Sequence, residues 1–146
     1  MKIMASACLL GENCKYSGGN NYSAKLAGYV SGNEVIPVCP EVLGGLPVPR
    51  VPCEIVNGVV TDRNGIGRDA EFRRGAEIAL ETAKREQVDL VILQSRSPSC
   101  GVHQVYDGTF SGKLRDGQGI FAELLTKNGF NVTDIEDLKT ETENES

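Results

Sequence analysis

The sequence lacks several features that would place it in a large class of proteins. None of its apolar runs approaches the roughly 18 residues that cross a bilayer, so we expect no membrane span. The apolar stretch between Lys2 and Cys8 is too short for the hydrophobic region of a secretory signal. Lys and Arg do not cluster, and a net charge of −5 disfavours a nucleic-acid partner. These absences leave a small molecule as the expected partner.

The chain also lacks the cysteine pattern of a disulfide framework. It has five cysteines, an odd number, with no paired C-x-x-C motif. With 146 residues it can bury roughly two-thirds of its unfolded surface, so it needs neither disulfides nor a metal merely to fold. Metal-binding or reactive thiols in the reducing cytoplasm are therefore expected. Without repeats or linkers, we predict one domain over residues 1–135 and an acidic, frayed tail over 136–146.

The hydrophobic pattern alternates between strand and helix periods. The expected strands cover residues 3–7, 34–38, 88–93 and 130–134, and the expected helices cover residues 23–29, 70–87 and 118–128. This alternation predicts an α/β fold, a single small Rossmann-like domain with a mostly parallel sheet flanked by helices.

Local signals add detail between these elements. Asp69 is the expected N-cap of the helix over 70–87. Asn57-Gly58 predicts a hairpin between 54–56 and 59–61. In a second long loop, Asp107-Gly108 is a possible turn between 104–106 and 109–111.

Three cysteines each follow a predicted strand: Cys8, Cys39, and Cys100 in a Ser-Pro-Ser-Cys-Gly turn. The carboxyl ends of parallel strands meet at one edge of a sheet, so these thiols should converge on one crevice. Three thiols can hold a metal or an iron–sulfur cluster and leave one coordination position open. Cys14 could be a fourth ligand, while Cys53 is interpreted as structural. The alternative for each thiol is a small buried hydrophobic side chain.

Other side chains near these cysteines allow a functional and a structural interpretation. Glu41 could be a general base or an exposed loop carboxylate. Ser97 and Ser99 could position substrate or water, or only shape their turn. His103 could be a ligand or proton donor, or a solvated side chain. Arg50 could bind an anion, although a surface role is favoured.

Four blocks of the sequence, in order, resemble one family. It is a widespread bacterial and archaeal family, long labelled a domain of unknown function, that includes the 2-thiouracil desulfurases. The blocks are SACLLG at 6–11 and on to Tyr16, PVCPEVLGGL at 37–46 with Pro49-Arg50, SPSCG at 97–101 and YDGTFSG at 106–112.

The resemblance implies a 4Fe–4S cluster held by Cys8, Cys39 and Cys100, with one iron free to bind the sulfur of a thiolated nucleobase such as 2-thiouracil. It implies catalytic roles for Glu41 and for Ser97, with Cys14 not needed as a ligand. Water would replace the sulfur without redox chemistry, so neither NAD nor flavin is implied.

We also expect Ser99 and Gly101 to contact the substrate. Two rival functions remain open at this point. One is a sulfur carrier that forms a persulfide on a cysteine without a cluster. The other is a structural or regulatory metal module with ligands from Cys8, Cys14, Cys39 and Cys100.

Overall fold

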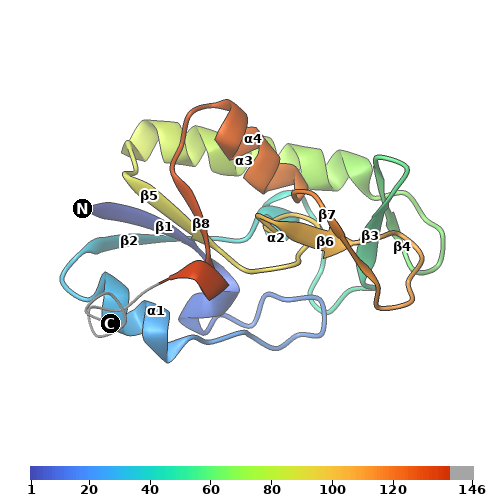
Figure 1. Ribbon diagram of the computed structural model, residues 1–146, viewed down its shortest axis with the longest axis horizontal. Coiled ribbons are helices and arrows are strands. Elements are labelled where there is room, and N and C mark those ends of the chain that lie inside the picture. Colours follow the sequence, from blue (N-terminus) through green and yellow to red (C-terminus); the bar gives the residue numbers. More distant parts are fainter. Residues whose placement is uncertain (139–146) are drawn as a thin grey trace.

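The central sheet has four parallel strands in the order β2-β1-β5-β8 (Figure 1). We describe residues 1–138 from a computed structural model. The strands are β1 (Lys2–Ser6), β2 (Glu34–Val38), β5 (Leu90–Leu93) and β8 (Val132–Asp134). The helices α1 (Ala24–Val30), α3 (Asp69–Glu86) and α4 (Ile120–Lys127) lie in the connections between them. The predicted α/β fold with a parallel sheet and flanking helices is confirmed.

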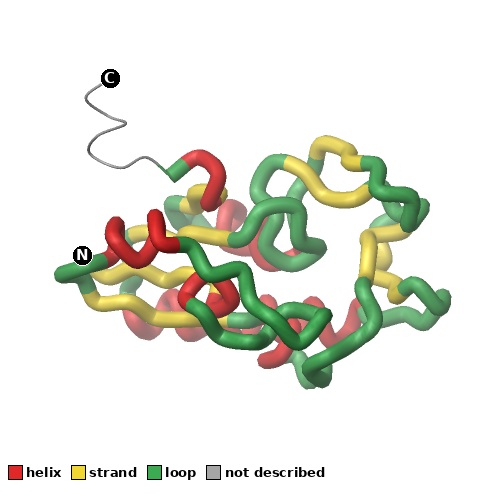
Figure 2. The backbone as a smooth tube through the Cα atoms, turned by 90° about the horizontal axis from the view of Figure 1, so that it is seen from below, coloured by secondary structure: helices red, strands yellow, loops and turns green. Residues whose placement is uncertain are grey.

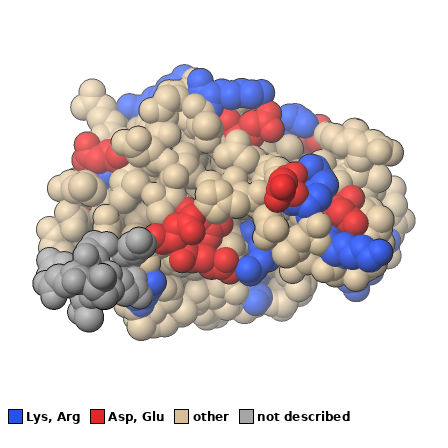
Figure 3. All heavy atoms as spheres, in the orientation of Figure 1, with Lys and Arg blue, Asp and Glu red and all other residues tan. Residues whose placement is uncertain are grey.

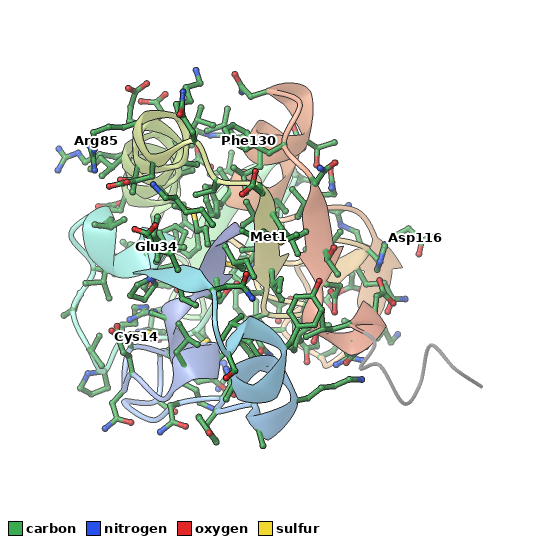
Figure 4. All side chains as sticks on the ribbon, turned by 90° about the vertical axis from the view of Figure 1, so that its left-hand side faces the viewer. Met1, Cys14, Glu34, Arg85, Asp116 and Phe130 are labelled. Atoms are coloured by element: carbon green, nitrogen blue, oxygen red, sulfur yellow. The ribbon has the colours of Figure 1, made fainter. Side chains whose placement is uncertain are left out.

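Both faces of the sheet are covered because successive strand residues point to opposite sides. Met4, Val91 and Leu93 pack with side chains of α3 and α4, whereas Ile3 and Ile92 pack in a second cluster. That second cluster includes residues of α1 and of the 3-10 helix η1 (Ala7–Leu10). Figure 4 shows the layers end-on, with Arg85 of α3 on one side of the sheet and Cys14 on the other.

Two small hairpins extend the molecule beyond the carboxyl ends of the strands (Figure 2). The first joins β3 (Cys53–Val56) and β4 (Val59–Asp62), and it confirms the Asn57-Gly58 turn. Asn57 and Gly58 have φ of 49° and 80°, as a two-residue hairpin of this type requires.

The second hairpin differs from the prediction. β6 (Gln104–Tyr106) pairs with β7 (Leu114–Asp116), not with residues 109–111. The intervening residues form a closed loop in which the Asp107 amide donates to the Lys113 carbonyl at 2.9 Å. The amides of Gly108 and Phe110 both donate to Glu54 Oε1 of β3. A distant carboxylate, rather than strand pairing, therefore shapes this loop.

The predicted cap of α3 is wrong. The N-cap is Arg68, whose side chain makes no capping hydrogen bond, and Asp69 is the first helical residue. The Asp69 carboxylate accepts instead from the Val60 amide at 3.0 Å and from Arg73 Nε at 2.6 Å. It thus ties the helix to the first hairpin.

The predicted strand over 88–93 begins two residues later, at Leu90. Gln87 adopts a left-handed conformation, and the Val88 amide donates back to the Ala83 carbonyl of α3. The first residues of the predicted strand therefore complete the helix end.

A short helix that the sequence pattern did not predict, α2 (Pro40–Leu43), follows Cys39 and packs against α3. The two backbones touch through glycines: a Cβ on Gly75 would lie 1.7 Å from the Pro40 carbonyl oxygen. Only glycine allows this approach. The contact fixes the start of α2, where Cys39 and Glu41 lie.

After β8, the 3-10 helix η2 (Ile135–Asp137) contains two residues of the predicted tail, and Leu138 is buried. The rest of that tail, residues 139–146, lies outside the described residues. Figure 3 shows acidic side chains gathered near the end of β8. There Glu136 pairs with Arg96, and Asp137 with His103. No helix among residues 1–138 is both long and apolar enough to cross a membrane.

Candidate active site

The carboxyl ends of three sheet strands open onto one cavity of about 500 Å³. Cys8 lies in η1 directly after β1, Cys39 directly after β2, and Cys100 in the turn that follows β5. All three line the cavity, as do Cys14 and Cys53. All five thiols are free. The convergence expected from parallel strands is confirmed.

The thiols of Cys8, Cys14 and Cys39 form a hydrogen-bonded group. The neighbouring Cys14 thiol lowers the pKa of Cys8 and of Cys39 to about 7, although burial opposes both shifts. The same two sulfurs raise the pKa of Cys14. Asn21 Nδ2 also donates to Cys8 Sγ at 3.5 Å. Cys8 and Cys39 are therefore the thiols that ionise most readily, and Cys39 Sγ also lies 3.8 Å from the Cys14 carbonyl, to which it donates.

Cys100 has different surroundings. Its side chain is buried, and this burial raises its pKa to about 12 even though the Ser6 and Ser99 hydroxyls oppose the shift. Ser99 Oγ lies 3.6 Å from Cys100 Sγ. Cys53, at the first position of β3, is half-buried, and desolvation raises its pKa to about 12 as well. Neither is a reactive thiolate in this state.

Glu41, in the first turn of α2, lies in the same cavity and is largely buried. Its Oε1 pairs with Arg50, at 3.1 Å from Nε and 3.0 Å from Nη2. Its Oε2 accepts from Ser99 Oγ at 2.8 Å. An exposed loop carboxylate is therefore not what the structure shows.

The favoured surface role of Arg50 is wrong, because only 6% of its side chain is exposed. Its guanidinium also donates to the backbone carbonyls of Cys14, at 2.9 Å, and Pro47, at 3.1 Å. Its burial could not be predicted, because the Pro-rich loop around it has no periodic pattern of apolar residues.

The two serines of the 97–101 turn make different bonds. Ser97 Oγ accepts the amides of Ser99 and Cys100, each at 3.1 Å, and lies 2.9 Å from Ser99 Oγ. A hydroxyl has one proton and two lone pairs. Because Ser99 donates to Glu41, Ser97 donates to Ser99, and its bonding capacity is then full. The hydroxyls form a line from Ser97 through Ser99 to Glu41.

Two other predicted residues lie outside the cavity lining. Gly101 is buried, and a Cβ there would lie 2.7 Å from the Gln104 carbonyl oxygen and 2.9 Å from that of Ser97. It allows the turn to close rather than reaching the cavity. His103 is exposed and pairs with Asp137, which raises its pKa. The structure thus favours the solvated interpretation of His103.

Three aromatic side chains that we assigned no role also line the cavity: Tyr16, Tyr106 and Phe110. Phe110 has a φ of 55°, which is uncommon for a residue with a side chain. Glu54 holds this backbone through the amides of Gly108 and Phe110. The only signal in the sequence was that Tyr106 and Phe110 lie within the last of the four blocks, and Tyr16 ends the first.

Comparison with known families agrees with this geometry. The sequence profile of the 2-thiouracil desulfurase family matches residues 3–137. The chain belongs to this family. The match covers the whole sheet apart from Lys2, the first residue of β1, and it covers every residue that lines the cavity.

Two relatives extend the comparison. The protein YbbK of Bacillus subtilis (strain 168), described only as uncharacterized, is 39% identical, over 89% of this chain and 93% of its own length. The solved structure of the [4Fe-4S]-dependent thiouracil desulfidase TudS superposes with a TM-score of 0.88 at 37% identity, covering 94% of this chain and 92% of that one. Family membership and this similarity indicate an enzyme of the desulfurase class.

Proposed function

We propose that the protein removes sulfur from a thiolated nucleobase such as 2-thiouracil, using a 4Fe–4S cluster held by Cys8, Cys39 and Cys100. The observation that supports this most directly is the meeting of these three thiols and the Glu41 carboxylate on one cavity. The family match and the likeness to TudS, a [4Fe-4S]-dependent enzyme, support it independently.

The residues present fit a cluster chemically. Soft thiols are the usual ligands of iron–sulfur clusters, and here they project from separate loops into a cavity without histidine. Within residues 1–138, no three His, Cys, Asp or Glu side chains are grouped tightly enough to surround a single ion. Cluster ligands need not be, because each cysteine binds a different iron. When bound, the cluster would supply an iron that is open to the substrate sulfur. Binding of the sulfur to this Lewis-acidic iron would withdraw electrons from the ring carbon.

Glu41 is the proposed base. Its carboxylate lies in a largely buried site beside the thiols, and a carboxylate placed there can accept a proton from water. The oxygen of that water then bonds to the ring carbon as the carbon–sulfur bond breaks. Sulfur leaves as sulfide, and the nucleobase product carries oxygen in its place. The exchange of sulfur for oxygen therefore needs no external electron donor.

Ser97 is the proposed partner of Glu41, and the structure adds Ser99 as the link between them. Ser97 Oγ reaches the carboxylate only through Ser99 Oγ, at 2.9 Å and 2.8 Å for the two steps. These hydroxyls donate toward the carboxylate and hold its Oε2 in place beside the thiols. Tyr106 and Phe110 offer apolar ring faces to a planar heterocycle. A small thiolated substrate met in the cytoplasm suits this site.

The position of Cys14 favours a second candidate, a structural metal module with four thiolate ligands. Cys14 contacts both Cys8 and Cys39, and Cys100 lines the same cavity, so all four thiols could be drawn onto one metal group. In that case no coordination position stays open for a substrate. The buried Glu41 carboxylate beside the thiols has no role in such a module.

The test is anaerobic reconstitution with iron and sulfide counts, followed by a screen of thiolated bases for sulfide release. We expect a brown protein with about four irons per chain. Cys100→Ala should lose the cluster. Glu41→Gln should keep the cluster and lose at least about a hundredfold in turnover, as expected on removal of a general base.

The matched control is Glu77→Gln, which removes an exposed carboxylate of α3 outside the cavity and should change nothing. A colourless, zinc-loaded protein would contradict the cluster. A fully active Glu41→Gln enzyme would remove the base from the mechanism.

A further inference from the structure

Arg50 carries a buried positive charge that pairs with the proposed base, Glu41. Its side chain is 6% exposed and that of Glu41 is 15% exposed. Taking two such groups out of water is costly, and a pair of well-packed apolar residues is often at least as stable. The fold therefore has little to gain from this pair as a stabilising feature.

The guanidinium has a protein partner at each of its three nitrogens. Nε and Nη2 lie 3.1 Å and 3.0 Å from Glu41 Oε1, Nη2 donates to the Cys14 carbonyl, and Nη1 donates to the Pro47 carbonyl. The Arg50 backbone amide donates to the Tyr16 carbonyl at 2.8 Å. A planar group held at three nitrogens cannot rotate without breaking bonds.

This arrangement divides the two oxygens of Glu41. Arg50 contacts only Oε1 of the carboxylate, and Oε2 accepts the hydrogen bond from the Ser99 hydroxyl. We propose that Arg50 is a positioning residue that fixes the Glu41 carboxylate in one rotamer, with Oε2 directed to the serine line and the reacting water. This inference rests on the function proposed above.

The same contacts argue against direct anion binding by Arg50. An anion that binds two adjacent nitrogens side by side would have to displace Glu41 or a backbone carbonyl, because Nε and Nη2 both lie against Glu41 Oε1 and Nη1 donates to the Pro47 carbonyl. Loss of the side chain should then affect turnover rather than substrate affinity. Misplacement of a catalytic group by about 1 Å can cost about a hundredfold in rate.

The test compares Arg50→Gln with the parent holoenzyme. We expect kcat to fall by about a hundredfold with KM changed by no more than about twofold. Iron content should be unchanged, and a crystal structure should show Glu41 Oε2 turned away from Ser99 Oγ. Guanidinium added to the buffer should restore part of the activity. In a Glu41→Gln background, Arg50→Gln should have no further effect, because the group that it positions is gone.

The matched control is Arg68→Gln, which removes an arginine from another buried carboxylate, Asp62, 3.4 Å away and outside the cavity lining. That variant should keep its kcat. If Arg50→Gln fails to fold, Arg50→Lys decides: kcat lowered about tenfold at full iron content supports the inference, since lysine lacks the planar fork.

Several results would overturn it: unchanged kcat in Arg50→Gln or Arg50→Lys, a rise in KM alone, or equal losses with and without the Glu41 carboxylate. These outcomes can be told apart from a failure of the proposed function. If the proposed function is wrong, the parent enzyme itself releases no sulfide.

Discussion

Single residues of the cavity differ in their surroundings although five of them carry the same thiol. Cys8 and Cys39 both contact the Cys14 thiol, Cys100 lies buried beside Ser99, and Cys53 lies at the first position of a hairpin strand. These differences separate proposed ligands from neighbours. Cys14 is the residue that distinguishes the two proposed functions, because it is a ligand in the metal module and not in the enzyme.

We predict that Cys14→Ser keeps about four irons per chain and keeps kcat within about twofold. The serine hydroxyl can still donate a hydrogen bond to Cys8 or Cys39, which is the contact that the thiol makes. Iron analysis and sulfide-release kinetics measure the outcome. Cys53→Ser, which changes another thiol of the cavity, is the control. Loss of iron in Cys14→Ser alone would support the four-thiolate module.

Among the elements, α2 has the largest influence on the site for its size. It has four residues, yet it follows Cys39 and contains Glu41. Its position depends on backbone contact with α3, since a Cβ on Gly44 would lie 1.9 Å from the Glu71 carbonyl oxygen. The long, amphipathic α3 therefore acts as the support from which one proposed ligand and the proposed base are placed.

We predict that Gly75→Ala lowers the free energy of unfolding by about 3 kcal/mol, because the new methyl group meets the Pro40 carbonyl and forces α2 away. Iron content after reconstitution should fall with it, as Cys39 moves. Gly28→Ala in α1 is the control, since nothing lies within 4 Å of its added Cβ. That variant should gain up to about 1 kcal/mol from helix propensity. Chemical denaturation of both variants checks this, and equal stabilities would contradict the packing.

Across the whole molecule, the apolar core depends little on the cavity thiols, although Cys100 belongs to one of its clusters and Cys8 and Cys14 belong to another. The two large apolar clusters lie on either side of the sheet, and they are built from strand and helix side chains far more than from the thiols. The cysteines follow the strands and lie on loops or at element ends. Such a fold can form before any cluster binds.

We therefore predict that removal of iron by a chelator leaves the far-ultraviolet circular dichroism and a single cooperative unfolding transition intact. The melting temperature should fall, because a group that binds only the folded state stabilises it. Thermal scans of both forms under anaerobic, reducing conditions measure the shift. A protein that unfolds when its iron is removed, as a zinc finger does, would show that the fold depends on the cluster.

Hydrophobic periodicity is enough to predict the succession of strands and helices along the chain and the place of Cys8, Cys39 and Cys100 after three strands. Hydrophobic periodicity is a local property, and parallel strands bring their ends together whatever their separation. The same local signals failed where a distant group decides the structure. Asp69 bonds to β4 instead of capping its helix, and the loop after Tyr106 follows Glu54 instead of pairing as a strand.

The hydrogen bonds among the polar side chains of the site could be learned only from the tertiary structure. Glu41 and Ser99 are 58 residues apart in the chain and 2.8 Å apart in space, and Arg50 is buried by loops with no periodic pattern. Such contacts depend on where separate segments meet, and no window of sequence contains both partners. The strand-end thiols could be predicted because the backbone places them, whereas the carboxylate, its arginine and its serines are placed by one another.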